Sequence, residues 1–319
     1  MAVFTPISDS VAESLLEDYD IGRFESLKPI TEGIENTNYF LRTTRGLHVL
    51  TIFERRTPAE GLPYVIDLMS LLARRGLPVP QPLPGKDGQI RRLLAGKSAM
   101  IVTFLKGRSV ADPGPEHCHA AGAALARLHL AARAWERRRD NPIGYRQWPQ
   151  IATSCEARVG AGDRDLMNVV RAALDLVLPR WPGALPRGAC HSDLFPDNVF
   201  FEDGRLSGLI DFYFACTDLL AYDLAVCIAA WCFRPDGAFD ATRCSRMLDG
   251  YRSLRPLEDA ERAHLPLLCL GAGIRFTLTR LYDRLYPRED ALVIEKDPDE
   301  FAGRMRHFYS VVLNGEPLV

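Results

Sequence analysis

The hydrophobic pattern of the chain changes near Gly107, and this change constrains the fold more than any other sequence feature. Before Gly107, apolar and polar residues mostly alternate, as in β-strands, whereas the later segments carry the spacing of helices. We therefore expect an α+β protein in two parts, a smaller sheet-rich part over residues 1–103 and a larger, mainly helical part over residues 104–319. A connector near Thr103 to Arg108 joins them.

Local signals place the individual elements within these two parts. Ser10 and Glu13 have the spacing of a capping box and predict that a short helix opens the chain. A turn at 44–46 predicts a hairpin. The expected elements are, in chain order, a helix over 10–18, strands over 38–43 and 47–53, a helix around 65–72, a strand over 99–105, helices over 116–139 and 166–178, two strands within 198–210, and helices over 219–231 and 258–285.

Charge and composition exclude several classes of protein. The 39 basic and 41 acidic residues nearly cancel, so no overall field recruits nucleic acid or an anionic membrane. No lysine or arginine precedes Arg23, and the most apolar stretch, 224–233, is far shorter than the roughly 20 residues of a membrane-spanning helix. The eight cysteines form no CxxC pair, which favours reduced thiols in the core. We expect a cytosolic protein with a small-molecule or protein partner.

The densest polar chemistry lies in the segment His191 to Asn198 and in Asp211. The dipeptide Asp203-Gly204 predicts a tight hairpin between them. With a two-residue turn, Asn198 pairs with Leu209, and Asp211 lies diagonally from Asn198 on the same face. An amide oxygen and a carboxylate are hard ligands that suit Mg²⁺. Asn198 and Asp211 are therefore the predicted metal ligands.

Asp193 lies in the same segment, where it can accept a proton from a hydroxyl group near that ion. The segment has the pattern HxDxxxxN, and phosphoryl-transfer enzymes of the protein-kinase type use this pattern for base and metal roles. The alternative is that Asp193 and Asn198 only cap a turn. The presence of all three polar residues around one apolar hairpin favours catalysis.

These motifs carry a family resemblance. Residues 191–198, 209–212 and 222–225 resemble the aminoglycoside-phosphotransferase and choline-kinase superfamily, which has the fold of protein kinases. Residues 33–38, 49–51, 210–216 and 231–232 are similar to the bacterial homoserine kinases of that superfamily. The resemblance runs from the opening helix to Lys296-Asp297-Pro298 and implies a bilobal, protein-kinase-like fold. A small antiparallel-sheet N-lobe then binds the nucleotide, and a larger, mainly helical C-lobe carries catalysis and substrate binding.

The resemblance also implies ATP and Mg²⁺. ATP is expected between the lobes, with its phosphates under the loop 32–38 and its adenine against the connector. Gly33 allows the backbone to approach a phosphate closely, although the loop has only this one glycine of the usual three. Its asparagines either donate to phosphate or support the turn. The implied nucleotide-binding residues are Gly33, Asn36, Asn38, Thr51, Thr103 and Leu105.

Two positions depart from the kinase pattern. Thr51 stands where the third strand usually carries a phosphate-binding lysine, and Val65 stands near the place of its glutamate partner. Arg55 or Arg56 would supply the missing charge, unless both are ordinary solvated arginines. These departures motivate one alternative, a non-catalytic pseudokinase scaffold.

The narrower resemblance implies a homoserine kinase that acts in threonine biosynthesis. Such an enzyme phosphorylates the hydroxyl of L-homoserine, with Asp193 as the base, and must also hold an α-carboxylate and an α-ammonium. Arg275 or Arg280 is the candidate for the carboxylate and Asp218 for the ammonium, unless these residues form ion pairs within the protein.

Another small alcohol is the alternative acceptor: choline, an aminoglycoside or a sugar. Choline would favour an aromatic cage, and an aminoglycoside an acidic pocket. The candidates for such a cage are Tyr213, Phe214, Tyr222 and Trp231.

Several further polar residues are predicted to be structural. His129 is expected to be a buried, hydrogen-bonded residue, and His191 to brace the loop that carries Asp193. Asp223 is interpreted as a loop-to-helix anchor that pairs with an arginine, Arg275 or Arg280. Residues 137–140 are interpreted as a solvated helix end. The sequence does not indicate an oligomeric state.

Overall fold

A computed structural model describes residues 5–30, 36–54, 59–287 and 296–319, so Gly33, Arg55 and Arg56 lie outside the described residues. The chain forms two compact units, Met1–Lys106 with Arg288–Ile294 and Gly107–Pro287 with Glu295–Val319. The first unit contains an antiparallel sheet and the second is mainly helical, so the predicted α+β fold class is confirmed. The predicted boundary at 103/104 lies close to the change of unit at Lys106.

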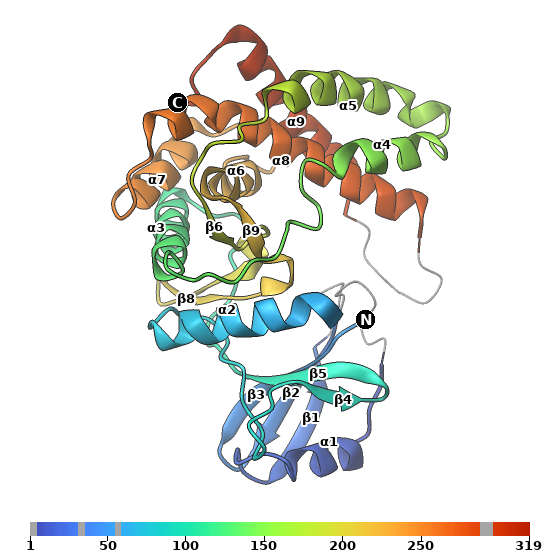
Figure 1. Ribbon diagram of the computed structural model, residues 1–319, viewed down its shortest axis with the longest axis vertical. Helices are drawn as coiled ribbons and strands as arrows, with labels where there is room; N and C mark the ends of the chain where they lie inside the picture. The colour runs from blue at the N-terminus through green and yellow to red at the C-terminus, as the bar shows by residue number, and fades with distance from the viewer. Residues whose placement is uncertain (1–4, 31–35, 55–58, 288–295) are drawn as a thin grey trace. The chain divides into compact units, whose positions relative to one another are not determined.

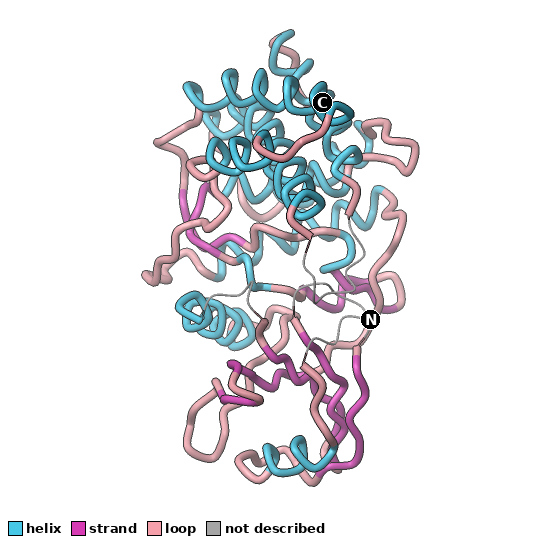
Figure 2. Tube along the Cα trace, turned by 90° about the vertical axis from the view of Figure 1, so that its right-hand side faces the viewer, coloured by secondary structure: helices cyan, strands magenta, loops and turns pink. Residues whose placement is uncertain are grey.

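The first unit is a five-stranded antiparallel sheet with a helix on each face (Figures 1 and 2). On one face, Ala12 and Leu16 of the first helix pack into a core with Leu41, Leu50 and Ile101 of the sheet. The second helix covers the other face. The elements are α1 (Asp9–Leu16), β1 (Phe24–Pro29), β2 (Thr37–Thr43), β3 (Gly46–Ile52), α2 (Leu62–Arg74), β4 (Arg92–Leu94) and β5 (Lys97–Thr103), with the strands in the order β1-β2-β3-β5-β4.

The opening helix begins earlier than predicted. Ser8 is its N-cap, because its side chain accepts a hydrogen bond from the backbone N–H of Val11. The predicted capping box of Ser10 and Glu13 is therefore wrong, since Ser10 already lies within the helix. Two serines at positions 8 and 10 compete for this role, and the sequence pattern alone selected the second.

The second unit is built around α6, which is buried along its whole length. Its helix α3 ends at Ala131, and the prediction of a helix to residue 139 is wrong because Arg139 pairs through its backbone with Thr217 instead. The chain from 132 to 147 runs as a loop. The helices are α3 (Pro115–Ala131), α4 (Trp148–Glu156), α5 (Arg164–Val177), α6 (Leu220–Trp231), α7 (Ala241–Arg252), α8 (Asp259–Leu285) and α9 (Pro298–Asn314).

Two short antiparallel strand pairs lie in the second unit. Strands β6 (Arg187–Cys190) and β9 (Cys216–Leu219) form one, and β7 (Val199–Glu202) and β8 (Arg205–Leu209) form the other. The β7–β8 pair has the predicted turn, but an extra residue, Ser207, forms a bulge in β8. Because of the bulge Val199, not Asn198, pairs with Leu209, and the predicted register is wrong at this end.

All eight cysteines are buried and free, as the sequence predicted. Among the helices that the structure describes, none combines the length and the apolar character that crossing a membrane requires.

Candidate functional site

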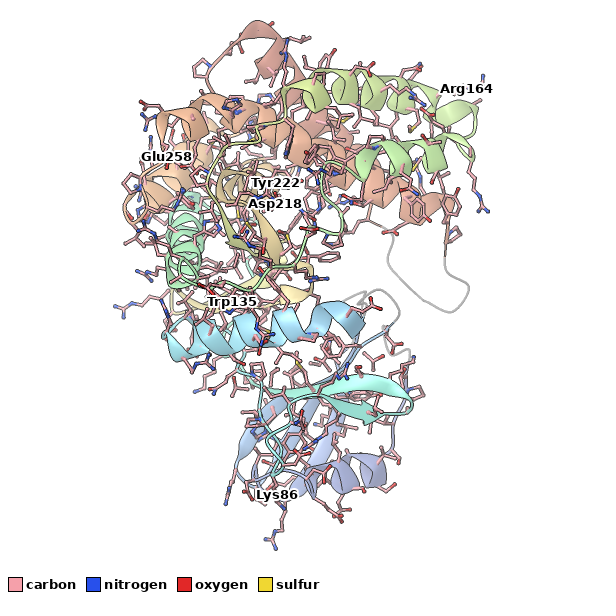
Figure 3. All side chains as sticks on the ribbon, viewed as in Figure 1. Lys86, Trp135, Arg164, Asp218, Tyr222 and Glu258 are labelled. Atoms are coloured by element: carbon pink, nitrogen blue, oxygen red, sulfur yellow. The ribbon has the colours of Figure 1, made fainter. Side chains whose placement is uncertain are left out.

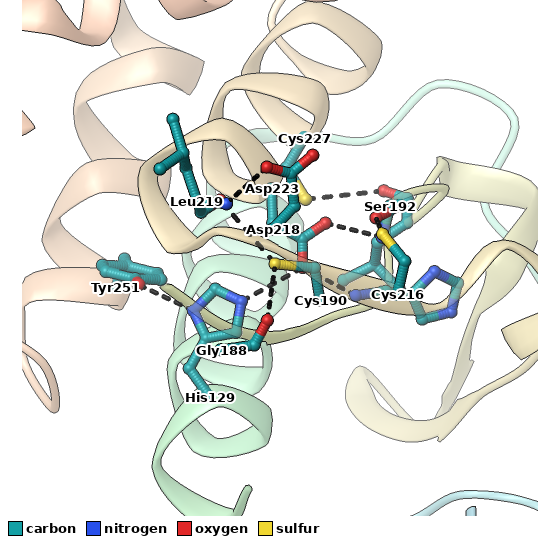
Figure 4. A network of polar contacts seen from close by, with 12 residues as sticks. His129, Gly188, Cys190, Ser192, Cys216, Asp218, Leu219, Asp223, Cys227 and Tyr251 are labelled. Atoms are coloured by element: carbon teal, nitrogen blue, oxygen red, sulfur yellow. Dashed lines mark hydrogen bonds and ion pairs between the residues drawn. The ribbon is translucent and has the colours of Figure 1, made fainter. Parts of the chain in front are cut away.

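The loop between β6 and β7 carries the HxDxxxxN segment, and Asp223 near the start of α6 holds this loop (Figure 4). The carboxylate of Asp223 accepts hydrogen bonds from the backbone N–H groups of His191 and Ser192, each at 2.7 Å. Ser192 has a φ of 66°, a left-handed conformation that is strained for serine. These bonds therefore fix an unusual backbone turn directly before Asp193.

Asp223 also bonds His129, whose Nε2 lies 3.1 Å from its carboxylate. The prediction that Asp223 is a loop-to-helix anchor is confirmed, but its partners are His129 and two backbone amides, and the predicted pairing with Arg275 or Arg280 is wrong. Burial raises the pKa of Asp223, but its hydrogen bonds and the charges of His129 and His191 outweigh burial and keep the pKa below its usual value. The anchor therefore stays ionised.

Asp193 is the central acid of this loop. The side-chain amide of Asn198 donates to the Asp193 carbonyl at 2.8 Å and lies 3.4 Å from its carboxylate. Burial raises the pKa of Asp193 to about 6, against the charges of Arg275 and Lys296, which lower it. A carboxylate with such a pKa is mostly ionised at neutral pH and is a better base than an ordinary aspartate.

Asn198 and Asp211 both lie at the open end of the β7–β8 pair. The backbone N–H of Ile210 donates to the carbonyl of Asn198 at 3.0 Å, so Asp211 follows the residue that faces Asn198. Asp211 has a φ of 63°, which turns the chain at this point. The Asn198 amide nitrogen faces Asp193, which leaves its amide oxygen on the other side. An amide oxygen and a carboxylate therefore lie at the same strand ends, and this donor set fits Mg²⁺.

Arg139 braces the segment that follows Asp211. Its guanidinium donates to the carbonyls of Tyr213 and Ala215, both at 2.8 Å, and its carbonyl accepts from Thr217 at 2.6 Å. The interpretation of residues 137–140 as a solvated helix end is thus wrong for Arg139. No local pattern reveals this role, because its partners lie more than seventy residues away.

Two cations lie beside Asp193. Arg275 on α8 donates to the carbonyl of Ser192 at 2.6 Å, and the Lys296 ammonium lies 3.3 Å from the carboxylate of Asp197. Lys296 also lies 5.5 Å from the centre of the Phe195 ring. No sequence motif predicts a separate role for Lys296. The site therefore combines a base with positive charge, which suits an anionic substrate.

The other predicted substrate residues of the second unit are already engaged. Arg280 donates to the carbonyl of Asp297 and to Glu300, at 2.9 and 2.6 Å. Asp218 on β9 accepts from the side-chain amide of Asn141 at 2.7 Å and from the backbone of Leu219 at 2.8 Å. Arg280 is thus held at the start of α9, and Asp218 lies at the end of the β6–β9 pair.

Two residues of the suggested aromatic cage, Tyr222 and Trp231, are core residues, each only 1% exposed. The indole N–H of Trp231 donates to the carbonyl of Leu194 at 2.8 Å. Trp231 therefore supports the Asp193 loop from within the core.

In the first unit, Thr51 faces Asn38 across the β2–β3 pair. The Thr51 hydroxyl donates to the side-chain oxygen of Asn38 at 2.7 Å. Asn36 accepts from the backbone N–H of Glu54 at 3.0 Å, and Glu54 accepts from the hydroxyl of Thr37 at 2.9 Å. The lysine position is thus filled by a neutral, hydrogen-bonded pair. The chain that follows residues 31–35 is therefore anchored at Asn36 and Thr37.

A hollow opens on the same face of this sheet. Strand alternation places Phe40 and Leu47 on the face that carries Asn38 and Thr51. The backbone N–H of Thr103, at the end of β5, donates to Gln81 at 3.0 Å and is therefore already engaged. The hollow is lined by Ser26, Lys28, Phe40, Arg42, Leu47 and Phe104.

Comparison with known proteins shows which family this chain belongs to. Residues 26–257 match the family described as "Phosphotransferase enzyme family". The chain belongs to this phosphotransferase family. A homoserine kinase of Acidiphilium cryptum is 50% identical over 306 residues, covering 96% of both chains. A homoserine kinase of Agrobacterium fabrum is 44% identical over 314 residues, covering 98% of this chain and 97% of the relative.

Solved structures agree with the fold of this phosphotransferase family. An amicoumacin kinase, solved with AMP-PNP and Ca²⁺, aligns with a TM-score of 0.71 and 17% identity, covering 98% of this chain and 95% of that one. A microcompartment-associated aminopropanol kinase aligns with a TM-score of 0.70 and 18% identity, covering 98% of this chain and 100% of that one. The family resemblance and the kinase-like fold inferred from the sequence motifs are confirmed.

Proposed function

We propose that this phosphotransferase transfers the γ-phosphoryl group of ATP to the hydroxyl of L-homoserine, giving ADP and O-phospho-L-homoserine. The observation that carries the proposal is the identity of 50% and 44% to homoserine kinases over almost their full lengths. The reaction belongs to threonine biosynthesis, as the sequence resemblance implies. The positive charges of Arg275 and Lys296 beside Asp193 support an acceptor that carries a carboxylate.

Asp193 is the proposed base. As the hydroxyl oxygen bonds to the γ-phosphorus, the bond from that phosphorus to the β,γ-bridging oxygen breaks, and the hydroxyl proton passes to Asp193. The pKa of about 6 leaves Asp193 ionised at neutral pH and ready for this proton. The Asp223 anchor keeps the loop that carries Asp193 in place.

Asn198 and Asp211 are the proposed ligands of Mg²⁺. When bound there, the ion neutralises charge on the phosphates of ATP and aligns them with the acceptor. The two residues hold these positions because the hairpin backbone fixes Asn198 and the left-handed turn fixes Asp211.

The first unit is the proposed nucleotide-binding unit. Asn36 and Asn38 follow Gly33 in the predicted phosphate loop. The hydroxyl of Thr51 donates to the side-chain oxygen of Asn38, so the amide nitrogen of Asn38 is the atom of this side chain that can donate to a phosphate. The hollow beside Phe40 offers an apolar surface for a base, next to the connector residues Thr103 and Leu105. No lysine is needed for these contacts, which makes the scaffold alternative unnecessary.

A panel of alcohols tests the proposal. The purified protein with ATP and Mg²⁺ is assayed for ADP release with L-homoserine, choline, ethanolamine and an aminoglycoside. We expect the highest kcat/KM with L-homoserine, and no homoserine-dependent turnover after Asp193→Ala with retained folding by circular dichroism. A higher kcat/KM with choline assigns a different acceptor, and ADP release at background with every alcohol supports the scaffold.

A further inference from the structure

Three buried donor groups in the second unit lack an acceptor among the residues that the structure describes. They are the Nε of Arg275, the hydroxyl of Tyr222 and the indole Nε1 of Trp181. Arg275 and Tyr222 are each only 1% exposed. Buried donors are normally paired, because an unpaired one loses its hydrogen bonds to water without replacement. Their common surroundings therefore need an explanation.

The three groups belong to one cluster. The rings of Trp181 and Tyr222 meet edge to face with centres 5.2 Å apart. The charge of Arg275 and its side-chain interaction with the Tyr222 hydroxyl lower the pKa of Tyr222, but burial has the larger effect and raises it, so the hydroxyl keeps its proton. Trp181 packs over Gly271, one helical turn before Arg275 on α8, where a Cβ atom would lie 2.5 Å from the indole ring. The cluster is thus built from the 181 segment, α6 and α8.

The charge pattern points to an anion. The groups are an N–H of a guanidinium, an N–H and an O–H, so what is missing is an acceptor, and Arg275 carries a positive charge. A carboxylate has two acceptor oxygens in one plane and is the preferred partner of arginine. Asp218, which Figure 3 shows beside Tyr222, is bonded to Asn141, Leu219 and Arg187, so it does not supply the missing acceptor.

The cluster is connected to the catalytic loop. The Nη1 of the same Arg275 donates to the carbonyl of Ser192 at 2.6 Å, and Ser192 directly precedes Asp193. One guanidinium therefore contacts the loop of the proposed base with one nitrogen, while its Nε is buried without an acceptor among the described residues.

We propose that Arg275, Tyr222 and Trp181 form the site for the α-carboxylate of the amino-acid acceptor. The inference rests on the proposed function and adds the residues that select an amino acid over an amino alcohol. Trp181 was not among the substrate residues expected from the sequence, and Tyr222 was expected only as part of a cage for choline. Of the two arginines predicted to bind the carboxylate, the cluster contains Arg275. The guanidinium of Arg280 is held by Glu300 instead.

Two analogues of L-homoserine separate the two charges. 3-Amino-1-propanol lacks the carboxylate, and 4-hydroxybutanoate lacks the ammonium. Tyr222→Phe removes one oxygen atom and Trp181→Phe removes the indole N–H. We expect each to raise the KM for L-homoserine and for 4-hydroxybutanoate by about 10-fold or more, with little change in kcat. The kinetics with 3-amino-1-propanol should stay unchanged, because that acceptor has no carboxylate to lose.

Tyr19→Phe is the matched control. The Tyr19 hydroxyl is also buried without a hydrogen-bond partner among the described residues, but it lies in the first unit. This control should leave all three acceptors unaffected. Without substrate, Tyr222→Phe should melt no lower than the wild type, because its hydroxyl has no protein partner to lose. Equal losses with all three acceptors, or no change in the KM for L-homoserine, overturn the carboxylate site.

Calorimetric binding of L-homoserine separates this inference from the proposed function. If the wild type turns over L-homoserine while Tyr222→Phe and Trp181→Phe match it, only the carboxylate site fails. If the wild type binds L-homoserine without phosphorylating it, and Tyr222→Phe weakens binding about 10-fold, the site stands and the proposed function fails. If the wild type neither binds nor phosphorylates L-homoserine, both the carboxylate site and the proposed function are overturned.

Discussion

Asp223 and Ser192 are joined by a hydrogen bond of 2.7 Å from the backbone N–H of Ser192 to Oδ1 of Asp223, and this bond fixes the left-handed turn that presents Asp193. The other oxygen of Asp223 accepts from His191 and from His129. Both carboxylate oxygens are therefore needed as acceptors. An asparagine in this position has only one acceptor and would place its amide against an N–H donor.

We therefore predict that Asp223→Asn lowers kcat strongly and destabilises the second unit by about 1–3 kcal/mol, because a buried donor loses its acceptor. Thermal melting and steady-state kinetics measure the two effects. Asp165→Asn, an exposed change in the first turn of α5, is the control and should leave both properties unaltered. Wild-type kinetics in Asp223→Asn would show that the anchor does not support catalysis.

The stability of the metal-free protein should depend on Asp193. Burial raises its pKa from 3.8 to about 6, so the folded protein binds the proton more tightly than the unfolded chain between these pH values. This group therefore favours folding below pH 3.8, and its contribution is lost as the pH rises through about 6. We predict that Asp193→Asn is inactive yet melts higher than the wild type at pH 8, with the difference shrinking as the pH falls. Equal melting temperatures of Asp193→Asn and the wild type at every pH would contradict this prediction.

Lys296 should set part of the pH profile. Its charge lowers the pKa of Asp193, against the larger effect of burial. Lys296→Gln removes that charge, so the pKa of Asp193 rises and the acid limb of the kcat/KM profile moves to higher pH. Lys86→Gln, a change at an exposed turn of the first unit, is the matched control. A limb that stays in place in Lys296→Gln would indicate that another group controls it.

The fold was largely predictable because its signals are local. The turn at Asp203-Gly204 and the buried helix α6 follow from neighbouring residues alone. The register beyond that turn does not follow from neighbouring residues, because the bulge at Ser207 accompanies a long-range contact. Arg108 pairs with Phe201 on the outer side of β7, and Gly107 approaches Ser207 so closely that a Cβ atom there would lie 2.3 Å from its hydroxyl.

The site was predictable to a lesser degree. Asp193, Asn198 and Asp211 lie on one loop and one hairpin, so their spacing carries information about their grouping. The contacts of Arg139 and the cluster of Tyr222 and Trp181 depend on segments far apart in the sequence. No periodicity or motif records such contacts. They become visible only when hydrogen-bond partners are examined in three dimensions.

Asp211 offers a sharp test of the metal site. Asparagine tolerates the left-handed backbone at this position, so Asp211→Asn removes the charge and keeps the turn. We predict a loss in kcat of about 10²-fold or more and a higher Mg²⁺ concentration for half-maximal rate. Asp203→Asn is matched to it, because Asp203 also has a left-handed backbone, with φ 49° in the β7–β8 turn. That control should keep the wild-type Mg²⁺ dependence, and the same dependence in Asp211→Asn would exclude Asp211 as a ligand.

The crossing of α3 and α7 depends on two glycines. A Cβ atom on Gly122 would lie 2.2 Å from the carbonyl oxygen of Met247, and one on Gly250 would lie 2.0 Å from that of His119. Gly122→Ala must therefore push the two helices apart, and we predict a destabilisation of about 1–3 kcal/mol in urea unfolding.

Gly303→Ala in α9 is the opposite control, because a Cβ atom there has no neighbour within 4 Å. It should stabilise the helix by about 0.5–1 kcal/mol, since alanine loses less backbone entropy than glycine on folding. Because both changes add one methyl group inside a helix, their opposite signs would isolate the close approach of α3 to α7 as the cause. A Gly122→Ala protein as stable as the wild type would mean that the two helices separate at little cost.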